Sequence, residues 1–349
     1  MIKTFARLLL GLILLSIVAG VILLMSVNTD QNKAAIQTAV LSGTGYELTI
    51  AGDMDIAFFP SVGLTLNDVR LKNPASPQEL ASTTAALLQV DLRALISGEI
   101  FIRELSTDDF HINYYIDALG KSNWDVETPV FNSNSSTNSA VPVPQPTQQQ
   151  SNTASTDINS DIVSVSFERL KIDNASIDIQ DLSQGLRYSV NNLNLTSSNT
   201  NIEGNPFDVD VNFTFLNNGM TKPVAMGFSG DITADLNAGN IDVQNISFNV
   251  TPVLLQGDLH IRGLNDDITF DGSVSSNDFD VFGLLQTIGI SESELDATSS
   301  LFSIAEKPQA SVATSFSGDE FGIKVPELIA QLSESRIEAN AEIRFAANL

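Results

Sequence analysis

The sequence contains no cysteine, so it can form neither disulfide bonds nor thiolate metal sites. Histidine is nearly as scarce, because His111 and His260 are its two copies. Both lie in segments of alternating polarity, and we interpret them as strand-surface residues rather than ligands. We therefore predict no metal site and no cofactor.

Sequence motifs of catalysis are also missing. The chain has no glycine-rich phosphate loop, no HExxH, no GxSxG and no Cys–His pair. The acidic pairs 108–109 and 266–267 are adjacent in sequence, and adjacent side chains on a strand point to opposite faces. Such pairs are poorly placed for acid–base work, so we predict that the protein is not an enzyme.

Basic residues are few. Seventeen Lys and Arg stand against 42 Asp and Glu, and the formal net charge is −25. Because phosphate binding needs clustered basic residues, we exclude nucleic acid as a partner. We interpret the acids as a solvated face. Calcium binding is the alternative for a cluster at Asn265, Asp266, Asp267 and Asp271, although its spacing is not that of an EF-hand.

One long apolar run stands out near the N-terminus. Leu8 to Val27 contains no charged residue and, at 1.5 Å per residue, spans about 30 Å as a helix, the thickness of a bilayer core. Lys3 and Arg7 precede it, so the positive-inside rule places residues 1–7 in the cytoplasm and the body outside. We predict an uncleaved transmembrane helix over 8–27. A cleavable signal peptide, whose apolar region is normally shorter, is the alternative.

Behind this run, the pattern changes to that of a sheet protein. Residues 32–41 have apolar positions at helical spacing, and Gly43 and Gly45 can end that helix. From Gly45 to Asn73, apolar and polar residues alternate, with a break at residues 59–60, which is typical of half-buried strands. We assign residues 28–131 to a first β module with a short amphipathic helix.

Residues 132–161 interrupt the pattern with Asn, Ser, Thr, Gln and Pro, and they contain almost no large apolar residue. They form either an interdomain linker or a long loop out of one sheet. Alternation resumes at Ile162, and we assign residues 162–349 to a second β module. Turn signals occur at 173–174, 217–219, 237–239 and 271–272, and helical patterns occur at 281–290 and 326–332.

A weak internal repeat links the two modules. Residues 102–112 and 167–177 share an apolar-x-x-Leu-x-x-Asp-x-x-x-Ile frame. We interpret each copy as a strand, a tight turn and a return strand, and repetition of such units is typical of an elongated sheet.

These patterns predict a mostly all-β fold, with an elongated antiparallel sheet curled into a groove or sandwich behind an N-terminal transmembrane helix. A long sheet must close, pack on a second sheet or curl over its apolar face. A sandwich core and a groove for lipid chains are both consistent with the alternation. From strand parity, the residues expected to face a lipid groove are Ile56, Phe58, Leu64, Leu66, Ile112, Phe213, Phe228 and Phe248.

Several segments together resemble the AsmA family of Gram-negative inner-membrane-anchored proteins. They are the apolar span, residues 44–73, residues 88–124, FERLKIDNASIDIQD at 167–181, the 204–207 stretch and NDFDVFGLLQTIGIS at 277–291. No single motif is specific, but their order is. Family members are usually longer, so the resemblance implies a short member or a fragment whose second module is incomplete at the C-terminus.

The resemblance implies a single-pass inner-membrane protein with its body in the periplasm, related in architecture to TamB and chorein-type lipid transporters. Its expected function is to assist phospholipid transport toward the outer membrane and outer-membrane biogenesis. The expected partners are the membrane, phospholipid acyl chains and outer-membrane assembly proteins. The alternative is a non-enzymatic scaffold or regulator of outer-membrane protein assembly that acts through protein contacts, and an enzyme acting on envelope polymers ranks third.

Overall fold

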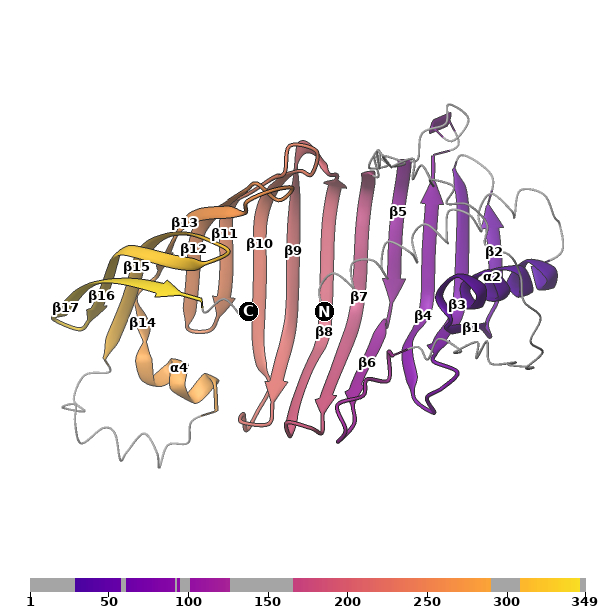
Figure 1. Ribbon diagram of the computed structural model, residues 1–349, viewed down its shortest axis with the longest axis horizontal. Helices are drawn as coiled ribbons and strands as arrows, with labels where there is room; N and C mark the ends of the chain where they lie inside the picture. The colour runs from indigo at the N-terminus through magenta and orange to yellow at the C-terminus, as the bar shows by residue number, and fades with distance from the viewer. Residues whose placement is uncertain are drawn as a thin grey trace, which may run out of the picture.

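The computed structural model describes residues 29–57, 61–91, 93–94, 101–125, 166–289 and 308–345. These residues form one mixed sheet of 17 strands, accompanied by the helices α2 (Thr29–Thr44) and α4 (Val281–Thr287) (Figure 1). The predicted span at 8–27 lies outside the described residues. Among the helices that are described, none combines the length and apolar character needed to cross a membrane.

The strands follow one another across the sheet almost in chain order. They are β1 (Glu47–Ile50), β2 (Met54–Ala57), β3 (Val62–Lys72), β4 (Glu79–Val90), β5 (Phe101–Asp108), β6 (His111–Ile116), β7 (Ser166–Asp181), β8 (Leu186–Thr200), β9 (Glu203–Asn217), β10 (Val224–Asp235), β11 (Asn240–Val250), β12 (Val253–Arg262), β13 (Thr269–Ser276), β14 (Phe279–Asp280), β15 (Gln309–Asp319), β16 (Gly322–Leu332) and β17 (Ser335–Arg344). Both β1 and β2 pair with β3 at one edge, and β17 pairs with β16 at the other.

Most neighbours are antiparallel, as expected, but the sheet is mixed rather than antiparallel throughout. Both β5 and β6 pair with β7 in parallel. Parallel neighbours need a long connection that returns the chain to the starting end, and residues 117–165 separate β6 from β7 in the sequence. The low-complexity segment 132–161 itself lies outside the described residues, but the strands that flank it are neighbours in one sheet.

The internal repeat forms this parallel pair. Ile102 lies opposite Phe167, Leu105 opposite Leu170, and Ile112 opposite Ile177, so the two copies pair in register. The expected hairpins are wrong. The second copy is one continuous strand, and the first is β5 and β6 in line along β7. A single residue at the same place in each copy, Asp109 and Asn174, adopts positive φ and bends the strand instead of reversing it.

Left-handed residues recur inside the sheet. Four of them, with φ values between 48° and 52°, lie within strands: Asp68, Asn174, Asn192 and Asn245. Asp and Asn tolerate this conformation better than other residues with a side chain, and such positions act as β-bulges that bend a strand and increase its twist. Consistent with accumulated twist, β16 and β17 lie across the view in Figure 1, whereas β7 to β10 run up and down.

Two of the three helices predicted from the sequence form, and the third does not. The pattern at 32–41 belongs to α2, which extends to Thr44 and ends before Gly45 at φ 78°. The pattern at 281–290 gives α4. The helix expected at 326–332 is wrong, because these residues belong to β16, where the register with β17 shifts between Val325 and Leu328. A bulge tolerates Pro326, which would break a regular central strand.

Candidate functional site

Strand pairing places the predicted groove residues of the N-terminal half on one side of the sheet. Residues paired across two strands share a face. Leu64 lies opposite Ile56 on β2 and opposite Leu88 on β4. Leu88 in turn lies opposite Leu105. Leu66 is two residues along from Leu64, so it lies on the same face.

The same face continues into the C-terminal half. From Leu105, successive cross-strand pairs lead to Leu170, Ser197 and Val209. Alternation along β9 puts Phe213 on the same face as Val209, and Phe213 lies opposite Met226 on β10. Phe228, two residues along from Met226, lies opposite Phe248. Ile112 joins through Ile177, Val190 and Phe215. Seven of the eight predicted residues therefore share one face, which we call the inner face. Phe58 lies outside the described residues. The opposite side is the outer face.

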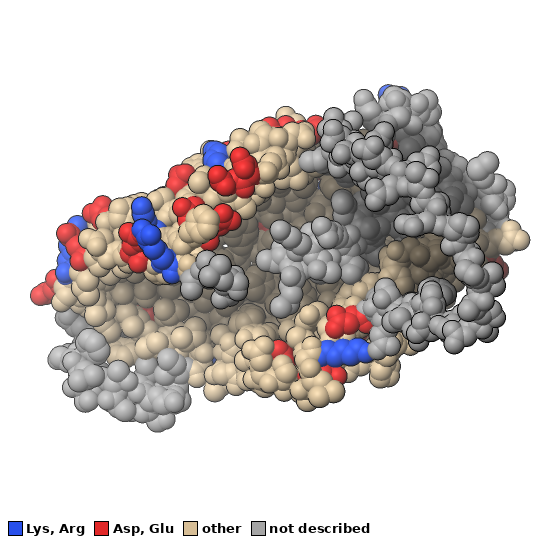
Figure 2. All heavy atoms as spheres, in the orientation of Figure 1, with Lys and Arg blue, Asp and Glu red and all other residues tan. Residues whose placement is uncertain are grey.

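The inner face is apolar and only partly covered. Phe213, Phe228 and Phe248 are half-buried, although each lies between two paired strands. A second sheet packed at about 10 Å would bury such side chains fully. Helix α2 packs on the inner face and lies in front of the sheet in Figure 1, so the inner face is turned toward the viewer. Figure 2 has the same orientation and shows this side hollowed, with uncharged side chains on its floor and charged ones mostly along its rims. The inner face is thus the floor of an open hollow.

Helix α2 closes the hollow at the N-terminal end. Ile36 and Val40 pack in one buried cluster with Leu64 and Leu71 of β3. The Lys33 Nζ donates a hydrogen bond of 2.7 Å to a backbone carbonyl oxygen at residue 52. This cluster is the main fully buried core of the described residues, so packing is dense beside α2 and open beyond it.

The single tryptophan of the sequence is part of this closure. Trp124 packs against the buried cluster, and its Nε1 donates to the Asn113 carbonyl oxygen at 2.9 Å. Tyr46 meets it edge to face at 5.8 Å, and the Tyr46 hydroxyl donates to the Trp124 carbonyl oxygen at 2.8 Å. Burial, followed by the nearby charge of Asp125, raises the pKa of Tyr46 above its usual value.

The outer face carries a ladder of polar side chains. The Thr84 hydroxyl donates to Asp109 at 3.1 Å, and the Asn174 Nδ2 donates to the same carboxylate at 2.6 Å. The Asn174 backbone N–H donates to the Asn194 Oδ1 at 3.0 Å, and the Asn194 Nδ2 donates to the Asn212 Oδ1 at 3.1 Å. The ladder crosses from β4 to β9 and connects the bulges of neighbouring strands.

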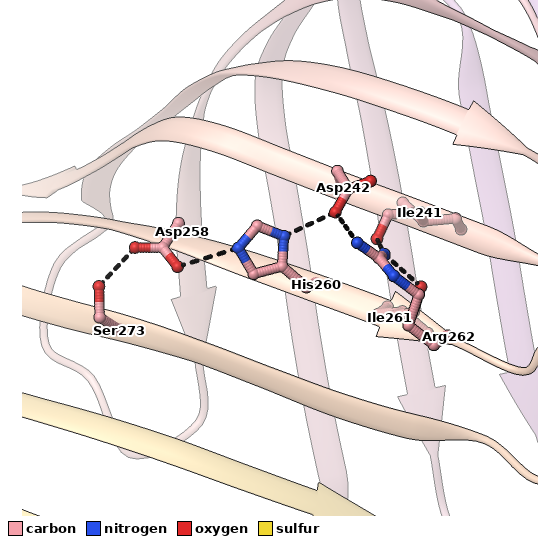
Figure 3. A network of polar contacts seen from close by, with 7 residues as sticks. All are labelled: Ile241, Asp242, Asp258, His260, Ile261, Arg262 and Ser273. Carbon is pink, nitrogen blue, oxygen red and sulfur yellow. Dashed lines mark hydrogen bonds and ion pairs between the residues drawn. The ribbon is translucent and has the colours of Figure 1, made fainter.

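A second polar network lies on the outer face of β11 to β13 (Figure 3). The carboxylate of Asp242 accepts from Arg262 at 2.5 Å and contacts His260 at 2.6 Å. Burial acts to raise the pKa of Asp242, but the hydrogen bonds from Arg262 and His260 outweigh it and hold that pKa below its usual value. Ser273 donates to Asp258 rather than to His260. We interpret this network as a clamp across three strands, because it has no Ser–His contact that would activate a nucleophile.

The cluster at 265–271 does not converge on a common point. The Asn265 Nδ2 donates to backbone carbonyl oxygens of residues 236 and 237, so this amide joins two turns. Asp271 lies on β13 opposite His260, and the turn expected at 271–272 is wrong, because both residues are inside that strand. Within the described ranges, no three His, Asp or Glu side chains are grouped to hold a metal ion.

The chain matches a known protein family. The family model of the AsmA family matches residues 2–219. The chain belongs to the AsmA family. The match includes the predicted span, α2 and the strands from β1 through β9. Neither the curated proteins nor the solved structures contain a match to this AsmA-family chain.

Sequence reasoning missed the outer-face ladder and part of the floor. Met226, Phe270 and Phe316 also lie on the inner face, and the last two rings are 6.4 Å apart. The ladder had a detectable signal, because Asp109 and Asn174 occupy equivalent positions in the internal repeat. From the sequence, Asp and Asn residues of this kind are interpreted as turn signals, and this interpretation does not predict that they lie in the course of strands.

Proposed function

We propose that this AsmA-family protein is anchored in the bacterial inner membrane with its body in the periplasm. There it assists phospholipid movement toward the outer membrane, and thereby outer-membrane biogenesis, by shielding acyl chains on the inner face. The observation that carries this proposal is the continuous apolar face, which extends from β2 to β16 and is left half-exposed beyond α2.

The energetics explain the value of such a face. A diacyl lipid has about 30 methylenes, and at about 0.8 kcal/mol for each one its transfer into water costs on the order of 20 kcal/mol. An apolar hollow with a solvated outer face removes most of this barrier without a chemical step. Large exposed apolar surfaces are uncommon on soluble proteins and usually mark a site of interaction.

The position of α2 supports the same proposal. It packs the N-terminal end of the inner face tightly, next to the predicted membrane span, whereas the floor from β7 onward has few fully buried side chains. Under the proposal, α2 closes one end of the inner face, and a lipid lies across the successive strands beyond it, with its acyl chains against Phe213, Phe228 and Phe248.

The test is to purify the full-length protein in mild detergent and to quantify its bound phospholipid by mass spectrometry. Phe213→Asp places a charge on the inner face and should reduce bound lipid several-fold. Asn212→Asp is the matched control, because it adds the same charge one residue away on the outer face and keeps an oxygen for the Asn194 amide. Circular dichroism checks that both variants fold.

Two results would contradict the proposal. One is wild-type protein that retains no phospholipid. The other is equal lipid in the Phe213→Asp and Asn212→Asp variants. Capture of assembly proteins by the outer face in the absence of lipid would favour the scaffold alternative.

A further inference from the structure

Three turns lie side by side at one end of strands β6 to β10, at the bottom of Figure 1. They are residues 117–121 after β6, residues 182–185 between β7 and β8, and residues 218–223 between β9 and β10. The Leu182 N–H donates to the Ile116 carbonyl oxygen at 2.9 Å, which ties the first two turns together. The Asn218 Nδ2 donates to the Gly185 carbonyl oxygen at 3.0 Å, which ties the last two. We call their combined surface the turn edge.

The turn edge exposes two leucines. Leu119 is 94% exposed, more than any other large apolar side chain of the described residues, and Leu182 in the adjoining turn is 45% exposed. The first turn has a defined shape, because the Asp117 carboxylate accepts the N–H groups of Leu119 and Lys121 at 2.8 and 2.9 Å. Single exposed apolar residues are ordinary on protein surfaces, so the meaning of this pair depends on the side chains around it.

Basic side chains surround the two leucines. Three bases lie in these turns or within two residues of them, and all three are exposed: Lys121, Arg187 and Lys222. The same positions hold two acids, Asp117 and Asp181, and each is hydrogen-bonded within its own turn. Arg187 and Lys222 have no ion-pair partner among the described residues, although the chain has a net charge of −25. The turn edge is therefore slightly basic in a strongly acidic chain.

The turns at the opposite ends of β8 to β13 differ in charge. They fall within residues 201–203, 235–239 and 263–268, which contain four acids and no lysine or arginine. An anionic lipid surface attracts clustered bases and repels clustered acids. The charges therefore direct the turn edge, and not the opposite end, toward such a surface.

Tyrosines lie just behind the turn edge. Three of the four in the sequence, Tyr114, Tyr115 and Tyr188, are within three residues of its turns. Both Tyr114 and Tyr188 are paired with Ile179. Ile179 is two residues along from Ile177 on the inner face, so the two tyrosines lie on that face as well. Tyrosine prefers the depth at which acyl chains meet headgroups, because its ring is apolar and its hydroxyl is polar.

We propose that the turn edge docks on the phospholipid bilayer that holds the predicted span. Leu119 and Leu182 enter its acyl region. The three bases lie at the level of its phosphates, as the long side chains of Lys and Arg do at membrane surfaces. The proposal rests on the inner-membrane anchor of the proposed function. Two leucines bind a free bilayer weakly, but an anchor in the same chain keeps its own bilayer at a high effective concentration.

Docking at the turn edge gives lipids a way onto the inner face. With the turns on the bilayer, β6 to β10 rise from its surface, and Tyr114 and Tyr188 lie between the headgroups and the apolar floor. A lipid then enters over the turn edge and reaches Phe213 and Phe228 without crossing α2, which closes the N-terminal end of the hollow. The turn edge is thus the entry side of the proposed lipid path.

Because the chain has no native cysteine, one engineered cysteine reports on one position. Ala118→Cys, beside Leu119, is introduced into the full-length protein, labelled with nitrobenzoxadiazole and reconstituted in nanodiscs of phosphatidylethanolamine and phosphatidylglycerol. Nitroxide-labelled acyl chains in the nanodisc should quench this label about fivefold more strongly than a label at Ile268→Cys, because only the first lies against acyl chains. Ile268 is the matched control, since it is an apolar residue, 38% exposed, in a turn at the opposite end.

A second arm of the experiment identifies the bilayer. The nitroxide lipid is placed only in added vesicles of the same composition, and quenching of the Ala118→Cys label should then stay at the level of the Ile268→Cys label. Quenching by the vesicles alone would assign the turn edge to a second membrane and overturn the proposal.

Substitutions in the Ala118→Cys protein test the two leucines. Leu119→Ser together with Leu182→Ser should lower quenching to the level of the Ile268→Cys label. Ile268→Ser removes an exposed apolar side chain elsewhere and should leave quenching unchanged.

Charge reversal tests the bases in the same labelled protein. Arg187→Glu together with Lys222→Glu should lower quenching more in these nanodiscs than in nanodiscs of phosphatidylcholine, which has no net charge. An equal effect in both would contradict the place given to the bases. All the substituted positions are exposed, and circular dichroism checks that each variant folds.

The proposal fails if the Ala118→Cys label is quenched no more than the Ile268→Cys label, or if the double-serine variant is quenched like its parent. Phospholipid bound to the purified protein in detergent keeps this test separate from the lipid function. The double-serine variant should retain as much lipid as wild type, because both leucines lie in turns, away from the floor. An absence of docking with normal lipid retention contradicts only the docking, and the reverse result contradicts only the lipid function.

Discussion

Single Asp and Asn residues in the left-handed conformation bend this sheet while keeping its inner face apolar. Asp68 illustrates how. Leu64 and Leu66 on one side of it and Leu71 on the other all face inward, although 66 and 71 differ by an odd number. The left-handed residue Asp68 interrupts the alternation by one position, so Leu71 returns to the face of Leu66. Strict alternation read from the sequence is therefore correct only between such residues.

Asn174 tests this role. Replacing it with Ala should destabilise the protein more than replacing it with Gly, by about 1 kcal/mol, because Ala at φ 52° carries a steric penalty that Gly avoids. Both variants lose the hydrogen bond to Asp109, so their difference isolates the backbone. Urea denaturation measures this difference in the free energy of unfolding, with the same m-value expected for both variants. A less stable Gly variant would contradict this explanation.

At the scale of the element, α2 acts as the end wall of the hollow. Its buried positions, Ile36 and Val40, have the helical spacing that the sequence shows, so both its existence and its inward face were predictable. What it packs against was not, because the spacing of apolar residues carries no information about distant partners. The same helical spacing also suits a helix that lies at a membrane interface, whereas the structure packs α2 on β3.

A matched pair of neighbours tests this wall. Val40 is 2% exposed and Leu41 is 47% exposed. Val40→Ala should lower the free energy of unfolding by about 1–3 kcal/mol, because it leaves a cavity under α2. Leu41→Ala should change it by less than about 0.5 kcal/mol. Denaturant melts measure both, and limited proteolysis after Lys33 reports whether α2 loosens. Equal effects would mean that α2 does not close the core.

The wrong helix at 326–332 has a local explanation. Leu328, Ile329 and Leu332 match a helical period, but Leu328 and Leu332 also match a strand period, with Ala330 between them. Short apolar runs do not separate the two periods. The pairing with β15 and β17 decides in favour of the strand, and such pairing depends on residues far away in the sequence.

For the whole molecule, the sequence was sufficient to predict a mostly β chain with one apolar face. Seven parity assignments, from Ile56 to Phe248, fall on one face because side-chain direction in a strand is a local property. The order and direction of strands are not local. The parallel pairing of β5 and β6 with β7 joins strands separated by a long stretch of sequence, and the composition of that stretch does not predict which strands become neighbours.

The floor of the hollow runs at right angles to the strands, so positions on β9 and β11 are passed in series by anything that travels along it. In a conduit, the slowest step sets the rate, whereas in a store the capacities add. If the protein conducts lipid, Phe213→Asp and Phe248→Asp together should slow transfer between donor and acceptor vesicles little more than the worse single variant does. If it stores lipid, the losses of bound lipid caused by the two substitutions should add. The same two substitutions therefore distinguish a conduit from a store.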